Sequence, residues 1–318
     1  MATTTTFVSI SDTHNLHREL SLPAADVLLH SGDFTLHGRL SEVADFVAWL
    51  ISQPHTMKIV IAGNHDLCMD RKGMFVGLSS ARAATALKNG EEARALFTSP
   101  EARAAGVVLL EETTVVTPGG FIVWGSGISP AIWGGLQVQR GDPSTEFFSR
   151  ISKEAHVLLT HGPPARTCDA VLRVSDPDYV CKCVGECECA PPGYLYERMH
   201  VGSAELGAEL VSRHAKGEHT PLAICCGHIH EGFGGALLSG APEVVVLNAA
   251  TLDHSYKVAH PPIVFSLSRN AEQLVELKVL SPTFEELVSW ANEHPDTDPE
   301  LQVPASLGGL ISRLPERA

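Results

Sequence analysis

The chain lacks several features that would define other classes of protein. It contains no run of about 18 apolar residues, so we expect no membrane-spanning helix. The first residues, MATTTT, contain neither a basic region nor an apolar stretch of the signal-peptide type. Eight cysteines in 318 residues are too few for a disulfide scaffold. Without a secretion signal we expect reduced thiols and a cytoplasmic protein.

Positive charge is also scarce. The chain has 23 Lys and Arg against 37 Asp and Glu, for a formal net charge of −14. General nucleic-acid binding needs clustered basic side chains and is therefore not expected. A phosphate-containing substrate would need local positive charge, which bound metal ions can supply.

The remaining composition is that of a globular protein, with 44% hydrophobic and 19% charged residues. Short apolar runs alternate with helix-period segments, a pattern that predicts an α/β (α+β) protein with layers of helix on sheet. We expect one domain over residues 1–281, with a Cys-rich, irregular insertion at about 165–200, followed by a C-terminal helix and tail over 282–318. The expected strands include 7–10, 27–29, 58–61, 107–110, 113–116, 121–124, 157–159, 222–226, 236–238, 244–247, 263–267 and 274–280. The expected helices are 41–51, one or two within 77–106, 144–154, 203–214 and 283–292.

Polar motifs follow five of these strands. They are Asp12-x-His14, Gly32-Asp33, Gly63-Asn64-His65-Asp66, His161-Gly162-Pro163-Pro164 and Gly227-His228-Ile229-His230. Loops at strand ends form one surface, so two Asp, one Asn and four His are expected to meet there. Such a set can hold two divalent ions a few ångströms apart, the arrangement used to hydrolyse phosphate esters.

Each motif has a plainer reading when taken alone. An Asp-x-His pair recurs by chance, Gly-Asn favours a turn, and a single loop histidine is usually structural. All five in order at strand ends favour a site. His65 is expected to act as a general acid on the leaving group, with Asp66 orienting its imidazole. Alternation along an extended segment would point the rings of His228 and His230 toward different ions.

The ordered motifs D-x-H, G-D, G-N-H-D, H-G-P-P and G-H-x-H resemble those of the calcineurin-like metallophosphoesterases. The likeness is greatest to the small metallophosphoesterase-domain-containing subfamily and covers about residues 7–268. It implies two facing mixed β-sheets flanked by helices, in a four-layer sandwich. It also implies that a hydroxide between two ions attacks phosphorus while His65 protonates the departing oxygen. The implied ligands are Asp12, His14, Asp33 and His230 for one ion, and Asp33, Asn64, His161 and His228 for the other.

The implied substrate is a small phosphodiester, such as a cyclic nucleotide or nucleotide derivative. Phosphoprotein phosphatases of the superfamily carry G-D-x-x-D-R-G, whereas this chain has Gly32-Asp33-Phe34-Thr35-Leu36-His37-Gly38, without the arginine. Phosphomonoesterase or phosphoprotein phosphatase activity remains an alternative, as does a non-catalytic metal-binding scaffold. Mixed Asp, Asn and His ligands suit Mn²⁺ foremost, or Fe or Zn²⁺. Protein partners are not indicated.

Two further groups of residues are candidates for a structural zinc site and for the wall of the substrate pocket. Four cysteines in the insertion form a candidate structural zinc site with Cys168 as a possible fifth partner, but a reduced loop or a redox-active pair is the favoured reading. These four are Cys181, Cys183, Cys187 and Cys189. The residues of a Gly-rich loop and of the segment after a late strand either line the substrate pocket or pack in the core. They are Trp124, Ser126, Ser129 and Trp133 in the first, and Asn248, His254 and Tyr256 in the second.

Overall fold

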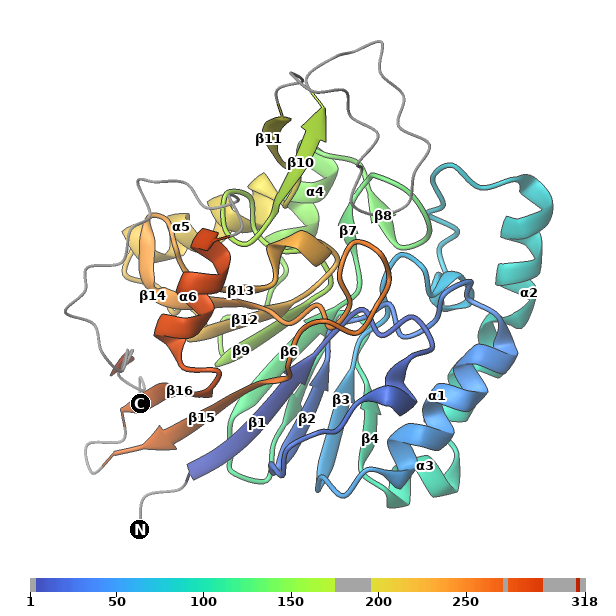
Figure 1. Ribbon diagram of the computed structural model, residues 1–318, viewed down its shortest axis with the longest axis horizontal. Coiled ribbons are helices and arrows are strands. Elements are labelled where there is room, and N and C mark those ends of the chain that lie inside the picture. The colour runs from blue at the N-terminus through green and yellow to red at the C-terminus, as the bar shows by residue number, and fades with distance from the viewer. Residues whose placement is uncertain (1–3, 175–195, 271–273, 294–312, 315–318) are drawn as a thin grey trace.

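The computed structural model describes residues 4–174, 196–270, 274–293 and 313–314. Within these residues, two mixed β-sheets face each other and helices cover their outer faces (Figure 1). The fold class expected from the sequence is therefore confirmed. In the described ranges, no helix combines the length and the apolar content required to cross a membrane.

The first sheet has the strand order β17-β16-β15-β1-β2-β3-β4. Strands β1 to β4 are parallel neighbours, and β15 joins β1 in the antiparallel sense. The strands are β1 (Thr4–Ile10), β2 (Val27–His30), β3 (Met57–Val60), β4 (Val107–Leu109), β15 (Ile263–Arg269), β16 (Val275–Ser281) and β17 (Arg313–Leu314).

The second sheet has the order β13-β14-β12-β9-β6-β5, with β14, β12, β9 and β6 parallel. Its strands are β5 (Thr113–Val116), β6 (Ile122–Ser126), β9 (Val157–Thr160), β12 (Ala223–Cys226), β13 (Gly234–Leu238) and β14 (Ala241–Asn248). Two short two-stranded sheets complete the set. They pair β7 (Ser129–Pro130) with β8 (Gln137–Val138), and β10 (Ala170–Val174) with β11 (Tyr196–His200).

Alternation along each strand divides the core into layers. Phe7 of β1 points between the sheets, where it stacks on Phe265 of β15, while its neighbour Val8 points to the outer face. Strands buried on both faces need apolar side chains at successive positions, which is why these runs are continuous and not alternating. The helices then cover the two outer faces.

The outer face of the first sheet packs against α1 (Leu40–Ser52), α2 (Ser80–Phe97) and α3 (Pro100–Ala104). The second sheet packs against α4 (Asp142–Phe148) and α5 (Ala204–Ala215). Helix α6 (Phe284–Glu293) lies against β13 and β16, where Phe284 and Leu287 join the core between the sheets. Ser79 and Ser203 cap α2 and α5 by accepting backbone N–H groups. Three short 3₁₀ turns are η1 (His17–Glu19), η2 (Leu67–Met69) and η3 (His230–Gly232).

Two expectations about local structure were wrong. The helix expected over 144–154 ends at Phe148, because Ile151 and Ala155 leave the helix to pack into the core beside β9. The region 165–200 was expected to be irregular, yet its described ends pair as β10 and β11, at the top of Figure 1. Short pairing between segments this far apart in sequence leaves no local signal.

The topology places the motif loops together. The parallel strands β1, β2 and β3 end at one edge of the first sheet, and β9 and β12 end at one edge of the second. An isolated bridge between Ser11 and Ala250 joins the two sheets at this edge. The loops that follow these five strands therefore meet.

Candidate metal centre

All seven expected metal ligands lie at this edge of the sandwich. Asp12 and His14 follow β1, Asp33 follows β2, and Asn64 follows β3. The three remaining histidines follow the strands of the second sheet: His161 after β9, and His228 and His230 after β12. Six of the seven side chains are buried and His228 is half-buried.

The first group is Asp12, His14 and His230, whose facing side-chain atoms lie within 4.8 Å of one another. Asp12 Oδ1 is 3.5 Å from His230 Nε2. The second Asp12 oxygen accepts the backbone N–H of His228 at 2.8 Å, which ties the β1 loop to the β12 loop. A carboxylate with two imidazoles in this geometry could hold one divalent ion.

The second group is Asp33, His161 and His228, with facing atoms again within 4.8 Å. His161 Nε2 lies 3.4 Å from Asp33 Oδ2 and 2.8 Å from Asn64 Oδ1. The same Asp33 oxygen is 3.8 Å from His14 Nε2, in the first group. Asp33 therefore stands between the two groups. His228 and His230 fall into different groups as expected, although a left-handed turn at His228 separates them and not the expected extended segment.

Backbone carbonyls orient the imidazoles. The Nδ1 atoms of His14, His161 and His230 lie 2.9–3.2 Å from the carbonyl oxygens of Thr35, Ser31 and Asp253. A carbonyl can only accept, so each Nδ1 carries the proton and each Nε2 faces the site. This is the usual arrangement behind a metal-ligating histidine.

Several buried polar atoms of the site have no hydrogen-bond partner within the described residues. They are Asp12 Oδ1, His14 Nε2 and His228 Nε2. Leaving one buried polar atom unpaired costs about 1–3 kcal/mol. These three all face the two groups, so the donor set fits divalent metal ions.

The charge states of the site reflect burial and the two carboxylates. Burial lowers the pKa of His14 to about 4 and that of His228 to about 3, so both imidazoles are neutral at pH 7 and each has one nitrogen with a free lone pair. Burial opposes ionisation of Asp12, but contact with His230 holds the pKa of Asp12 well below its usual value. Burial opposes protonation of His161, yet Asp33 raises the pKa of His161 to about 9. The carboxylates are thus ionised and attract cations.

The backbone at these loops is unusual. Asp12, His14, Asp33 and His228 all have positive φ, between 39° and 68°. Left-handed backbone costs a non-glycine residue of order 1–3 kcal/mol and clusters at functional sites. The cost is tolerated here because the turns aim four side chains at one point.

Two motif glycines allow the loops to approach each other. A Cβ atom on Gly227 would lie 2.0 Å from Asp12 Oδ2, and one on Gly63 would lie 2.3 Å from Asp33 Oδ1. These glycines are needed for contact between loops, which explains why glycine precedes the polar residue in both motifs.

His65 lies beside the two groups, but Asp66 does not orient it. The Nδ1 atom of His65 is 3.0 Å from the carbonyl oxygen of Leu36, which takes the place expected for Asp66. The His65 backbone N–H donates to Asp33 Oδ1 at 2.8 Å. The His65 ring also packs edge-on against His14, with centroids 4.7 Å apart.

Asp66 joins two loops instead. It is fully buried and accepts from Thr35 N, Thr35 Oγ1 and Gly63 N at 2.6–2.8 Å, with a longer contact from Phe34 N. Burial and the Asp33 charge raise the pKa of Asp66 to about 8, while these four donors favour its carboxylate form. The expected orienting contact between Asp66 and His65 is therefore not formed, because the Asp66 carboxylate accepts from Thr35 and Gly63 instead. A catalytic role for Asp66 stays a prediction.

A cavity of about 400 Å³, which we call the motif cavity, opens over both groups. Beyond the motif residues it is lined by Trp133, Glu231, His254 and Tyr256. Of the residues for which the sequence left open either pocket lining or core packing, Trp133, His254 and Tyr256 line this cavity, whereas Glu231 was missed although it directly follows His230. The other flagged residues are buried and pack elsewhere: Trp124 in the core beside α4 and α5, Ser126 and Ser129 in hydrogen bonds, and Asn248 on two backbone carbonyls.

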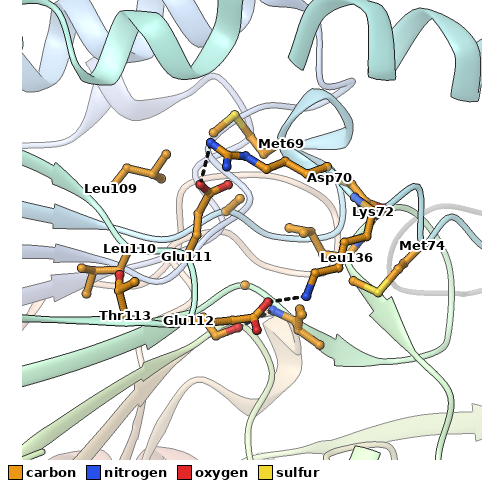
Figure 2. A pocket seen from close by; sticks show the side chains of 15 residues that line it. Met69, Asp70, Lys72, Met74, Leu109, Leu110, Glu111, Glu112, Thr113 and Leu136 are labelled. Carbon is orange, nitrogen blue, oxygen red and sulfur yellow. Dashed lines mark hydrogen bonds and ion pairs between the residues drawn. The ribbon is translucent and has the colours of Figure 1, made fainter. Parts of the chain in front are cut away.

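A second cavity, of about 480 Å³, lies behind the Asn64 loop, and we call it the paired cavity (Figure 2). Its apolar wall includes Met69, Leu109 and Leu136, and charged residues surround it. Lys72 Nζ is 2.9 Å from Glu112 Oε1, and Arg71 is 3.3 Å from Glu111. None of the expected ligands lines this cavity.

The candidate zinc site falls outside the described residues. Cys181, Cys183, Cys187 and Cys189 all lie between residues 174 and 196. The expected fifth partner, Cys168, is buried in the apolar cluster beside α5, and burial raises the pKa of its thiol to about 12. Cys225 and Cys226 are fully buried free thiols at the end of β12.

Comparison with known proteins identifies the family. A family model described as calcineurin-like phosphoesterase matches residues 5–232, well over half of the chain. The chain belongs to this family.

Named relatives agree. The chain is 32% identical over 274 residues to Metallophosphoesterase domain-containing protein 1 of Homo sapiens, covering 83% of this chain and 71% of that protein. It is 30% identical to UPF0046 protein C25E10.12 of Caenorhabditis elegans, covering 82% and 80%. A solved structure, TT1561 of Thermus thermophilus, superposes with a TM-score of 0.43 at 15% identity, covering 86% and 94%. A superposition of that quality is no basis for transferring function.

Proposed function

We propose that this protein is a phosphodiesterase that uses two divalent metal ions to hydrolyse small phosphodiesters, such as cyclic nucleotides or nucleotide derivatives. The observation that carries the proposal is the pair of ligand groups that share Asp33, with buried donor atoms left without partners. Hydrolase chemistry is what the family membership indicates, and the number of ions and the preference for diesters are the proposed parts.

The proposed ligands form two sets that share Asp33. Asp12, His14, Asp33 and His230 would hold one ion, and Asp33, Asn64, His161 and His228 the other. When bound, such ions act as Lewis acids on the phosphoryl oxygens and provide a nucleophile at neutral pH. Oxygen and imidazole donors together suit Mn²⁺, with Fe or Zn²⁺ as alternatives.

His65 would protonate the departing oxygen from Nε2. Its Nδ1–H donates to the Leu36 carbonyl, so the acid would be the imidazolium form, which presents a second N–H at Nε2 to the cavity and keeps its Nδ1–H after the transfer. The bond from the His65 backbone N–H to Asp33 fixes the distance between the acid and the shared carboxylate.

The charge of the motif cavity supports diesters over monoesters. Its described lining includes Asp33 and Glu231 but neither Lys nor Arg. A monoester carries about one more negative charge than a diester at neutral pH, since its second pKa is about 6. A cavity with no fixed cation beyond the metal site therefore favours the singly charged diester, and the lack of an arginine between Gly32 and Gly38 points the same way.

The test is metal-dependent hydrolysis of bis-p-nitrophenyl phosphate beside p-nitrophenyl phosphate. Wild type is compared with His65→Ala and Asp33→Ala, and bound metal is counted by elemental analysis. We expect Mn²⁺-dependent turnover of the diester, lost in both variants. Faster turnover of the monoester would favour a phosphomonoesterase. Two bound metals without turnover of either ester would favour the non-catalytic scaffold.

A further inference from the structure

Two aromatic side chains outside the five motifs contact the proposed acid. The ring centroids of Trp133 and His65 are 5.0 Å apart, and those of Tyr256 and His65 are 6.4 Å apart. Tyr256 also packs on His14 and His230, at 4.9 and 5.2 Å. Both side chains line the motif cavity.

Trp133 is held from the side of α2. Arg82, near the start of α2, places its guanidinium carbon 5.5 Å from the centre of the indole. A Cβ atom on Gly77 would lie 2.7 Å from Trp133 Cδ1, so backbone packs directly on the ring. Val76 and Gly134 exchange two backbone hydrogen bonds, which join the loop of Trp133 to the segment before α2.

Tyr256 is held by a strained turn. Its φ is 58°, and its backbone N–H donates to the Asp253 carbonyl at 2.9 Å. The Asp253 side chain accepts the N–H groups of Ser255 and Lys257, which closes the turn. The same Asp253 carbonyl orients His230, so the phenol is fixed relative to the proposed metal site. Strain of this kind at a cavity wall indicates a functional position.

The position of the rings relative to His65 decides which part of a substrate they would touch. His65 is proposed to protonate the departing oxygen, so the group attached to that oxygen must lie on the His65 side of the phosphorus. Trp133 and Tyr256 are the aromatic side chains of the described cavity lining that pack on His65, with Tyr256 also spanning toward the first ligand group. Flat rings stack well on such side chains, whatever the ring's exact identity.

We infer that Trp133 and Tyr256 form the leaving-group site, and that the enzyme selects phosphodiesters whose departing alcohol or phenol carries a flat aromatic ring. His254 supports a ring that bears polar atoms, because its Nε2 is buried at this cavity and lacks a hydrogen-bond partner in the described chain. The inference rests on the proposed function and adds its substrate class.

The test uses the Mn²⁺-loaded protein and three diesters. Methyl p-nitrophenyl phosphate has one aromatic group, which leaves. Bis-p-nitrophenyl phosphate has an aromatic group on both sides, and bis(2,2,2-trifluoroethyl) phosphate has none. We compare wild type with Trp133→Leu, Trp133→Phe and Tyr256→Leu, and use Ile132→Ala as the matched control because Ile132 is exposed on the same loop.

We expect Trp133→Leu to lower kcat/KM for both nitrophenyl esters by the same factor, roughly ten- to a hundredfold. The trifluoroethyl ester should change by less than about threefold, and Trp133→Phe should restore most of the loss. Tyr256→Leu should show the same selectivity, and Ile132→Ala should leave all three rates unchanged.

Two kinetic outcomes would overturn the inference. Equal losses on all three esters would mean that the rings only position His65. A loss confined to the bis ester would mean that they bind the retained group.

If wild type hydrolysed none of the three, the proposed function would fail, and the aromatic site would be decided by calorimetry. Phenyl methylphosphonate should then bind wild type at least tenfold more tightly than Trp133→Leu, whereas methyl methylphosphonate should bind both alike. Equal affinities of phenyl methylphosphonate for the two proteins would reject the aromatic site as well.

Discussion

The motif cavity and the paired cavity have similar volumes, but they differ in whether the polar side chains around them have partners. In the lining of the motif cavity, His14, His228 and His254 each keep a buried atom without a partner in the described chain, as does Asp12 beside the lining residue His230. Around the paired cavity, Lys72 meets Glu112 and Arg71 meets Glu111, and no described lining atom is both buried and unpaired. The motif loops are also strained, with four expected ligands at positive φ.

The contrast makes the motif cavity the better candidate for a binding site. Unpaired buried polar atoms and strained backbone lower the stability of the folded chain, and a ligand that binds there recovers part of that cost. Charges that neutralise each other need no ligand. Size alone would have selected the paired cavity, which is the larger of the two.

The largest expected effect is at the residue shared by both ligand groups. Asp33→Asn keeps the side-chain volume but removes the charge, so we expect kcat/KM to fall on the order of 10³-fold, equivalent to several kcal/mol. Stabilisation by Mn²⁺, about 2.7 kcal/mol at a hundredfold excess over Kd in wild type, should disappear from thermal melts. Asp45→Asn, at an exposed residue paired with Arg18, is the control. If Mn²⁺ stabilised Asp33→Asn as much as wild type, the motif cavity would not be the metal site, and its contrast with the paired cavity would have no functional meaning.

The next largest effect tests whether Asp66 is structural. Asp66→Ala leaves buried N–H groups of Thr35 and Gly63 without an acceptor, so we expect a loss of about 3 kcal/mol or more in the free energy of unfolding. Asp66→Asn should lose less because its oxygen keeps some of these bonds. Urea denaturation measures both. A variant with wild-type stability but a strongly reduced kcat would instead support the predicted catalytic role of Asp66.

A smaller effect is expected at the glycine that touches Asp12. Gly227→Ala places a methyl group against the carboxylate, so overpacking should cost about 1–3 kcal/mol and weaken Mn²⁺ binding. Gly207→Ala, inside α5, places its Cβ 3.8 Å from Pro164 Cβ, an ordinary van der Waals distance, and should be neutral or stabilising by up to about 1 kcal/mol. Calorimetric titration and thermal melts on both variants separate the two outcomes. Equal Mn²⁺ affinity in Gly227→Ala and wild type would show that the contact is not needed.

The smallest effect is expected at the paired cavity. A double-mutant cycle with Lys72→Met and Glu112→Gln should give a coupling of about 0.2–1 kcal/mol, because both side chains are partly exposed. Hydrolysis of bis-p-nitrophenyl phosphate should stay within about twofold of wild type. A larger change in rate would show that the ion pair at the paired cavity affects hydrolysis at the motif cavity, so the paired cavity would no longer count as a gap in packing.

Much of the fold could be read from short apolar runs, because strands buried on both faces need continuous apolar sequence. The strands β1, β2, β3, β9 and β12 and the helices α1 and α5 lie close to where the pattern predicts them. The pairing of β10 with β11 could not be predicted, since their partners are set by tertiary contact. The seven ligand positions stay a prediction about metal, but their convergence on one edge is a property of the structure.

The sequence by itself determined the motifs, their order and their place at strand ends, because side-chain chemistry and apolar periodicity depend only on residue type and spacing. Only the tertiary structure decided which atom holds His65, where Asp66 turns and which rings face the proposed acid. The reason is physical. Every residue has a backbone carbonyl, so the amino-acid sequence does not indicate that the carbonyl of Leu36 is the one that orients His65. Likewise, Trp133 reaches His65 only because two loops distant in sequence pack together.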